Sequence, residues 1–556
     1  MIFIKKKTTQ IFTLLIFLLF SSLLTAAELT FFEVHKDGIN GVDGLSRARG
    51  VTISPDGKQL YVAGLDDAVV VFNRNTTTGA LTYLEVHKDG INGVDGLNGA
   101  NGITISPDGK QLYVTGSADD AVAVFIRNST TGALTYLEVH KDGKNGVDGL
   151  DNATKIIISP NGKQLYVTGA FDNAVVVFNR NSITGALTYL EVHKDGINGV
   201  DGLAEARGVT ISPDGRQLYV TGSVDDAVAV FNRNSTTGAL TYLEAHKDGS
   251  NGVDGLDGAN GVTISPDGKQ LYVAGLVDDA VAVFNRNTTT GALTYLEVHK
   301  DGQNGVDGLA GASVVSISPD GKQIYVTGFW ENAVAVFNRN DTTGALTYQE
   351  VHKNGINGVD GLNGAAGVTI SLDGKHLYVA GQSDDAIVVF TKSSLDYVPD
   401  SGNPSGTIAF SATGQTLSAL SITTADGNNP TGLTTSYGKI SYQVTSPNNG
   451  TATVRLTFST TLPAIFTVYK VNNAGNYTPI PENAGADGFW VKIDANTIDV
   501  TLLDNGAFDL NPALGIIDDP IVIGVLGAAN AIPTLSFWAI LFLTGFLSLF
   551  ARRKLK

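Results

Sequence analysis

The chain has 556 residues, 43% of them hydrophobic and 16% charged, and its 65 glycines follow no collagen-like period, which indicates a folded protein with many tight turns. It contains no cysteine, which excludes disulfides, thiolate metal sites and cysteine nucleophiles. The formal net charge of −17 argues against a nucleic-acid partner, because phosphates need a basic surface.

The first segment is typical of export. Three lysines at 5–7 precede an apolar run over 11–24, and two alanines follow at 26 and 27. This pattern predicts a signal peptide over residues 1–27, with an uncleaved N-terminal anchor as the alternative. The two terminal segments together hold seven basic residues and no acidic one, which leaves 30 basic and 54 acidic residues, a net charge of −24, between them. Such a charge favours cations as ligands, or solubility outside the cytoplasm.

One sequence is repeated seven times along the chain. EVHKDGINGVDGL occurs at 33–45, 85–97 and 191–203, with near copies from Glu138, Glu244, Glu297 and Glu350. The histidines of successive copies are 52 residues apart once and 53 residues apart five times. A fixed period of about 50 residues is typical of propeller blades or of a solenoid.

The content of one unit decides between these two architectures. Residues 81–128 contain four runs with strand-like patterns, LTYLEVH, GITIS, QLYVTG and AVAVFIRN. They are separated by Gly-, Asn- and Asp-rich loops and by the tight turn PDGK, and no run has a helical period. Four-stranded sheets repeated radially form a β-propeller.

The two ends of the repeat array predict how the ring closes. The array opens with a lone outer strand at 28–35 and finishes with the third strand of a unit at 386–393. The seventh unit must therefore take its fourth strand from the N-terminus, whereas a solenoid would need polar caps instead. We predict an all-β chain whose residues 28–395 form a seven-bladed propeller closed by an N-terminal strand.

The runs SPDGKQLYVTG and DDAVAVFNRNSTTGALTYLE resemble the repeats of the seven-bladed lactonase-like propeller family. They also resemble the related surface-layer repeats named for a Tyr-Val-Thr-Asn signature. The resemblance covers about residues 28–395 and implies the propeller fold. Propellers of this type include lactonases, binding proteins and structural surface proteins. The resemblance matches no family catalytic residue to a position in this chain, so no catalytic or cofactor-binding residue is predicted.

The loops on one face of the predicted ring are acidic. The loop after the outer strand and the loop between the second and third strands share this face, while Lys110 and Arg127 give positive charge to the other. The pattern D-G-x-N-G-x-D-G spaces oxygen atoms as a calcium loop could use them. Alternatively, the same side chains bind their own loop backbone. The candidate calcium ligands are Asp37, Asn40, Asp43, Asp89, Asn92, Asp95, Asp142, Asp148, Asp195, Asp201, Asp248, Asp254, Asp301, Asp307 and Asp360.

The near-identity of the repeats argues against an enzyme. Catalysis needs a few different residues at one point, whereas near-identical units place the same residue seven times around an axis. The departures that we note are FWEN at 329–332 and AFDN at 170–173, both in loops of the acidic face. The seven repeat histidines end the outer strands, so we expect them to pack at the rim rather than to gather as ligands. His376, which replaces a glutamine of other copies, has no predicted role.

A second domain is expected after the repeats. Residues 396–407 are rich in Pro, Gly and Ser and are interpreted as a linker. Residues 408–526 contain β-like runs between Gly, Asn and Pro turns, which predicts a small β-sandwich. VYKVNNAGNYTPIP and TIDVTLLDNGAFDLNPALGIIDDP resemble a stalk-like domain that precedes C-terminal anchors in exported bacterial proteins.

The segment 532–556 resembles the IPTL-type C-terminal sorting signal of Gram-negative bacteria. It has the motif, an apolar span and a basic end. The resemblance implies recognition by an exosortase-type enzyme, at least transient contact with the membrane, and delivery to the cell envelope or surface; an ordinary membrane anchor is the alternative. The residues that carry it are Ile532, Pro533, Thr534, Leu535 and Trp538.

These observations predict an exported, surface-displayed propeller that acts as a binding module. Its acidic face would contact calcium, a polysaccharide or a protein, and seven weak sites on one ring would gain strength by avidity. An exported lactonase-like hydrolase and a purely structural envelope protein are the two alternatives.

Overall fold

The computed structural model of the protein contains strands throughout and confirms the all-β prediction. It describes residues 29–392, 394–397, 406–411, 417–423, 433–445, 451–458, 466–471, 477–483, 488–493, 497–503 and 516–526, which hold 38 strands. Within these residues, we find no helix with the length and hydropathy needed to cross a bilayer. The predicted signal peptide and sorting signal lie outside the described residues.

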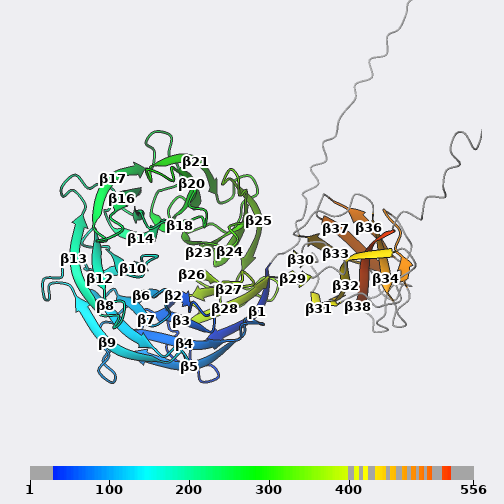
Figure 1. Ribbon diagram of the computed structural model, residues 1–556, viewed down its shortest axis with the longest axis horizontal. Helices are drawn as coiled ribbons and strands as arrows, with labels where there is room; N and C mark the ends of the chain where they lie inside the picture. Colours follow the sequence, from blue (N-terminus) through cyan, green and yellow to red (C-terminus); the bar gives the residue numbers. More distant parts are fainter. Residues whose placement is uncertain are drawn as a thin grey trace, which may run out of the picture.

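Seven four-stranded antiparallel sheets form the propeller (Figure 1). The innermost strands are β2 (Ala48–Ile53), β6 (Ala100–Ile105), β10 (Ala153–Ile158), β14 (Ala206–Ile211), β18 (Ala259–Ile264), β22 (Ala312–Ile317) and β26 (Ala365–Ile370). The second strands are β3 (Gln59–Gly64), β7 (Gln111–Gly116), β11 (Gln164–Gly169), β15 (Gln217–Gly222), β19 (Gln270–Gly275), β23 (Gln323–Gly328) and β27 (His376–Gly381). Blade 1 begins at β2, and blades are numbered along the chain.

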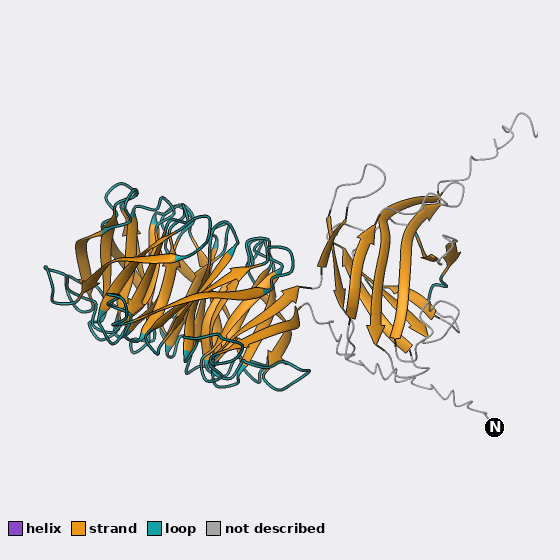
Figure 2. Ribbon diagram, turned by 90° about the horizontal axis from the view of Figure 1, so that it is seen from below, coloured by secondary structure: helices purple, strands orange, loops and turns teal. Residues whose placement is uncertain are grey.

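The outer half of each blade completes its sheet. The third strands are β4 (Ala68–Arg74), β8 (Ala121–Arg127), β12 (Ala174–Arg180), β16 (Ala227–Arg233), β20 (Ala280–Arg286), β24 (Ala333–Arg339) and β28 (Ala386–Lys392). The outer strands are β5 (Leu81–Lys88), β9 (Leu134–Lys141), β13 (Leu187–Lys194), β17 (Leu240–Lys247), β21 (Leu293–Lys300), β25 (Leu346–Lys353) and β1 (Leu29–Lys36). Seen from the side, the loops project from the two faces of this ring (Figure 2).

The ring closes as predicted. The sheet of blade 7 has the order β1-β28-β27-β26, so the first described strand is its outer strand. The register runs from Leu29 opposite Lys392 to Lys36 opposite Ala386. Closure across the ends of the array removes the exposed sheet edges that an open row of blades would leave.

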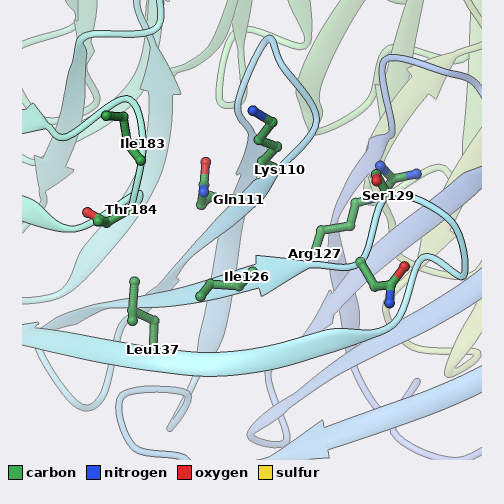
Figure 3. A pocket seen from close by; sticks show the side chains of 9 residues that line it. Lys110, Gln111, Ile126, Arg127, Ser129, Leu137, Ile183 and Thr184 are labelled. Carbon is green, nitrogen blue, oxygen red and sulfur yellow. The ribbon is translucent and has the colours of Figure 1, made fainter.

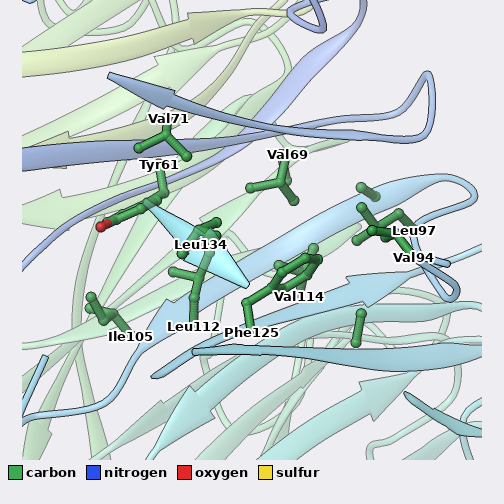
Figure 4. Packing of buried hydrophobic residues seen from close by; sticks show 13 residues of the cluster. Tyr61, Val69, Val71, Val94, Leu97, Ile105, Leu112, Val114, Phe125 and Leu134 are labelled. Atoms are coloured by element: carbon green, nitrogen blue, oxygen red, sulfur yellow. The ribbon is translucent and has the colours of Figure 1, made fainter. Parts of the chain in front are cut away.

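The hydrophobic core lies between adjacent blades. The second strands read QLYVTG or similar and are buried on both faces, as a strand covered by two blades requires. Figure 4 shows the packing between blades 1 and 2, where Tyr61 and Val71 of blade 1 contact a cluster that includes Leu112, Val114 and Phe125 of blade 2. Seven such interfaces carry most of the buried apolar surface, whose removal from water stabilises the fold.

Buried polar links repeat between the blades. Arg127 donates from Nε to the Tyr61 hydroxyl of the previous blade at 2.7 Å and from Nη1 to Gly109 O at 3.0 Å. Its side chain is only 2% exposed. The prediction that Arg127 supplies positive charge to the surface is therefore wrong: the side chain extends beneath the neighbouring blade. Burial raises the pKa of Tyr61 to about 12, so this hydroxyl stays protonated and available as a donor to Gly132 O.

The rim carries a second repeated link. His87 of β5 contacts Glu85 Oε1 at 3.0 Å and packs on Phe125 of blade 2 with the ring centroids 5.5 Å apart. The same Glu85 oxygen accepts the backbone N–H of Leu134 at 2.7 Å. Corresponding contacts join each blade to the next, which confirms that the repeat histidines pack at the rim.

Glycine allows the innermost strands to approach one another around the axis. A Cβ atom at Gly50 would lie 2.1 Å from the Asn101 carbonyl oxygen of the next blade, and one at Gly208 would lie 2.1 Å from Asn260 O. These distances exclude any other residue without a shift of backbone. The central channel is consequently narrow.

The remaining strands form two five-stranded antiparallel sheets. One has the order β29-β30-β33-β37-β36 and the other β31-β32-β38-β34-β35. Strands β29 and β30 include residues at both ends of the expected 396–407 linker. The bounds are β29 (Ser394–Tyr397), β30 (Gly406–Ser411), β31 (Leu417–Thr423), β32 (Leu433–Thr445), β33 (Thr451–Phe458), β34 (Thr467–Val471), β35 (Tyr477–Pro479), β36 (Gly488–Lys492), β37 (Thr497–Leu503) and β38 (Ile516–Leu526).

Candidate active site in the central channel

The innermost strands are the part of the blades that differs most in chemistry. All seven begin with alanine, but the next residue changes from blade to blade, and the third residue is glycine except in blades 3 and 6. The second residues are Arg49, Asn101, Thr154, Arg207, Asn260, Ser313 and Ala366. The exceptions at the third position are Lys155 and Val314. The strands that surround the axis therefore lack sevenfold symmetry.

Two small cavities lie along the channel and share Arg49. The inner one has a volume of about 80 Å³ and is lined by Arg49, Lys155 and apolar side chains from blades 1, 2, 3, 6 and 7. The outer one, of about 190 Å³, is lined by Arg49, Arg207, Leu276, Phe329 and Trp330, among others. Both are below the roughly 300 Å³ at which drug-sized sites begin, so they suit a small molecule.

Three cationic side chains meet in this channel. Burial, together with the charges of Arg49 and Arg207, lowers the pKa of Lys155 to about 7. Burial, with Arg207 and Arg47 nearby, lowers the pKa of Arg49 to about 10. Within the part of the chain that the structure describes, neither Arg49 nor Lys155 has a side-chain hydrogen bond or ion pair. Both side chains are only partly exposed to solvent, and cationic groups gathered at one place without an anionic partner point to an anionic ligand.

Neighbouring polar groups are also incompletely satisfied. Arg207 donates from Nη2 to Glu205, but its buried Nε has no hydrogen-bond partner in the described structure. Asn101 occupies the strand position of Arg49 in blade 2, is 3% exposed, and its Oδ1 is likewise without a partner. Buried polar groups without partners are uncommon in folded proteins and call for an explanation. A small polar molecule bound in the channel would give these atoms hydrogen-bond partners.

This arrangement is suited to reactions that develop negative charge. Arginine forms directional hydrogen bonds to carboxylate and related oxygens. A lysine whose pKa is near 7 is about half deprotonated at neutral pH, so its Nζ can accept a proton as a general base. Lys155 and the two arginines come from three different blades, and together they provide the convergence of different groups that the repeat pattern had argued against.

The predicted calcium ligands divide into two groups with different contacts. The first aspartate of each loop accepts a backbone N–H of its own loop, as Asp89 Oδ1 does from Leu97 N at 3.0 Å. In the last copy Asn354 Oδ1 accepts the equivalent bond from Leu362 at 3.1 Å, which explains why the charge is dispensable there. Asn40 and Asn92 have φ of 53°, a left-handed conformation that asparagine tolerates in turns.

The second aspartate of each loop contacts a lysine from the next outer strand. Lys247 Nζ lies 2.8 Å from Asp201 and 3.2 Å from Asp225, and the hydrogen bond to Asp201 raises the pKa of this lysine. Five blades bring three carboxylates within 4.8 Å of one another. They are Asp89, Asp95 and Asp119; Asp142, Asp148 and Asp172; Asp195, Asp201 and Asp225; Asp248, Asp254 and Asp278; and Asp301, Asp307 and Glu331. Since an ammonium group already bridges each set, calcium binding stays a prediction.

A larger hollow lies on the opposite face but has different chemistry. It has a volume of about 620 Å³ and is lined by Ile126, Leu137 and Ile183 with Lys110 and Arg127 (Figure 3). The Arg127 guanidinium already donates hydrogen bonds to Tyr61 and Gln59 of the previous blade. The smaller central cavities are the better candidate for chemistry.

Sequence reasoning missed Arg49, Lys155 and Arg207. The expected functional residues were those that the repeats share, and departures between copies were considered only in the loops. Aligning the seven copies of ARGVTI, ANGITI and their relatives would have isolated these positions, because the rest of each strand varies little in chemistry. Of the loop departures that were noted, Phe329 and Trp330 do lie at the mouth of the channel.

Comparison with known proteins agrees with the propeller fold. The family described as "Lactonase, 7-bladed beta-propeller" matches residues 43–190, 98–255, 153–310 and 310–400, together well over half of the chain. The chain belongs to this family. Membership confirms the lactonase-like propeller that the repeats resemble.

Several relatives carry lactonase names. A 6-phosphogluconolactonase of Klebsiella pneumoniae (strain 342) is 25% identical over 298 residues, which cover 52% of this chain and 76% of that protein. A 6-phosphogluconolactonase of Enterobacter sp. (strain 638) is 22% identical over 349 residues, 61% of this chain and 89% of that protein. Among solved structures, the periplasmic gluconolactonase of Pseudomonas aeruginosa covers 55% of this chain and 85% of its own, at 20% identity and a TM-score of 0.45.

Proposed function

We propose that the protein is a lactonase-like hydrolase whose active site is the central channel. The observation that carries this proposal is the meeting of Lys155, Arg49 and Arg207, from three blades, without a carboxylate partner for Arg49 or Lys155 among the described residues. Family membership and relatives named as 6-phosphogluconolactonases support it. This hydrolase was the alternative to the binding module, and the comparisons favour it over the binding module.

The reaction converts a cyclic ester and water into a hydroxy acid. Neutral Lys155 accepts a proton from the attacking water, while its oxygen bonds to the lactone carbonyl carbon. Arg49 and Arg207 stabilise the negative charge that develops on the carbonyl oxygen. The ring C–O bond then breaks and the leaving oxygen takes the proton from Lys155. The new carboxylic acid releases its own proton to solvent, and the product carboxylate remains beside the arginines. The charge of the channel thus complements the transition state and the product more strongly than the uncharged ester group.

The test is lactone hydrolysis by the full chain, measured as acid release above the spontaneous rate. We expect Lys155→Met to lower kcat by about 10²–10⁴-fold, the range for loss of a general base. In the native protein kcat/KM should rise with pH through about 7, because Lys155 becomes neutral there, and Lys155→Met should abolish this rise. Lys322→Met, at an exposed lysine of the opposite face, is the matched control. Rates equal to buffer with every lactone, or an unaffected Lys155→Met variant, would contradict the proposal.

We also propose that the hydrolase acts outside the cytoplasm. Support comes from the signal-peptide pattern of residues 1–27 and from the IPTL-like segment at 532–556. In this proposal an exosortase-type enzyme processes the C-terminal segment, and the strands of residues 408–526 serve as a stalk between propeller and envelope. Cell fractionation of the native host, followed by mass determination of the mature termini, tests it; an intact chain in the cytoplasm would contradict it.

A further inference from the structure

The lining of the outer cavity includes three large apolar side chains, Leu276 of blade 5 and Phe329 and Trp330 of blade 6. The other lining residues are Arg49, Arg207, Asn260, Ser313 and Gln382. The three apolar side chains, which we call the apolar wall, come from the loops between the second and third strands. Their positions are occupied by smaller or polar residues in blades 2, 4 and 7, where the sequence reads Ser117-Ala118, Ser223-Val224 and Gln382-Ser383.

The apolar wall is held firmly in place. Phe329 N donates to Gly311 O at 2.9 Å, and Trp330 N donates to Ala310 O at 3.1 Å, so the loop is bonded to the start of its own inner strand. A Cβ atom at Gly311 would lie 2.9 Å from Cγ of the Trp330 indole, which shows that the ring rests on this glycine. Trp330 is nevertheless 55% exposed, so one face of the indole is free to meet a ligand.

The exposed apolar surface continues beyond the cavity on the same side. Val277 and Val224, the loop residues that correspond to Trp330 in blades 5 and 4, are 54% and 67% exposed, and Phe171 of blade 3 follows. On the other side of the mouth the corresponding residues are Ser383 in blade 7 and Ala118 in blade 2. These exposed apolar residues belong to blades 3–6, whereas blades 2 and 7 carry small or polar residues and blade 1, whose loop is one residue shorter, carries Leu65.

The chemistry of this wall differs from what a phosphorylated sugar needs. A sugar lactone has hydroxyl groups around its ring, and hydroxyls placed against leucine and phenylalanine lose hydrogen bonds to water without replacement. An apolar substituent gains by the same contact, because its surface and that of the wall leave water together. Resting on the proposed lactonase function, we propose that the preferred substrates are small lactones with an apolar substituent of about one ring, seated against Phe329 and Trp330.

The experiment compares substrates that share the reacting ester. The full chain is assayed with a phenyl-substituted γ-lactone, with glucono-δ-lactone and with its 6-phosphate. We expect the phenyl lactone to have the highest kcat/KM. The double variant Phe329→Ser, Trp330→Ser introduces the residues that other blades carry at these positions, so it should fold. It should lower kcat/KM for the phenyl lactone by about 10–100-fold and leave glucono-δ-lactone within about threefold.

Controls separate this inference from the proposed function. Ile183→Thr removes an exposed apolar side chain on the opposite face and introduces the residue that other copies carry there, so it should change neither rate. A preference of the native protein for the 6-phosphate, or equal losses on both lactones in the double variant, would overturn the inference while leaving the lactonase proposal intact. Hydrolysis of none of the three lactones would overturn both.

Discussion

The outer strands of the propeller make the same contacts in every blade, whereas the inner strands carry different residues from blade to blade. At the rim, one set of contacts recurs in blade after blade: a glutamate accepts the next blade's backbone N–H, and a histidine covers the next blade's phenylalanine. At the axis, the residue after the shared alanine is arginine, asparagine, threonine, serine or alanine according to the blade. The contacts that recur in every blade stabilise the scaffold, and the residues that differ between blades form the candidate site. A search for function in a repeat protein should therefore start where the copies disagree.

Removing the closing strand should have the largest effect on the scaffold. Deletion of residues 1–36 takes away β1, which forms seven residue pairs with β28 and buries Leu29. Loss of these hydrogen bonds and of the buried surface should lower the free energy of unfolding by more than about 5 kcal/mol. Deletion of residues 1–28 is the control, because it leaves β1 whole. Urea unfolding measures both, and equal midpoints would show that ring closure contributes little.

A smaller effect is expected at His376, where one inter-blade link departs from the others. Its Nδ1 lies 2.8 Å from Arg74 Nη2, the place that a glutamine oxygen takes in other blades. Burial, reinforced by the charge of Arg74, lowers the pKa of His376 to about 4. The folded protein therefore keeps this histidine neutral where the unfolded chain protonates it. The associated stability is complete above the unfolded pKa of 6.5 and declines as the pH falls toward 4.

The variant His376→Gln should remove this dependence, since glutamine is present at the same position in the other blades. Relative to the native protein, the variant should gain up to about 3 kcal/mol of unfolding free energy between pH 7 and pH 4. Urea unfolding at several pH values measures the difference. Parallel stability curves for the two proteins would mean that His376 does not titrate as its burial implies.

Calcium should have the smallest effect. Lys141 Nζ lies 2.8 Å from Asp95 and 3.1 Å from Asp119, and calcium would have to displace it. We expect 1 mM calcium to raise the melting temperature by less than about 1 °C, because little binding means little stabilisation. Lys141→Met removes the competing charge and serves as the comparison. A shift of several degrees in the native protein, reversed by chelator, would support the calcium loops after all.

The sequence was sufficient for the scaffold because the scaffold is periodic. The spacing of the repeat histidines and the lone strand at the start of the array predicted seven blades and their closure through β1. It was insufficient for Arg127, whose surface-like position at a strand end does not reveal that the guanidinium passes beneath the next blade. Lys155 was missed for a related reason. Only the arrangement of the inner strands around the axis shows that the Lys155 side chain lines a cavity together with Arg49.

The most direct test makes the inner ring symmetric. The triple variant Arg49→Asn, Lys155→Gly, Arg207→Asn gives the inner strands of blades 1 and 4 a second residue, and that of blade 3 a third residue, found elsewhere in the ring. Lactone hydrolysis and melting temperature are measured on the full chain. We predict an equal or higher melting temperature, because the repulsion among three neighbouring cationic side chains is removed, together with complete loss of hydrolysis. Hydrolysis at the native rate by this folded variant would contradict the claim that the departures from symmetry form the active site.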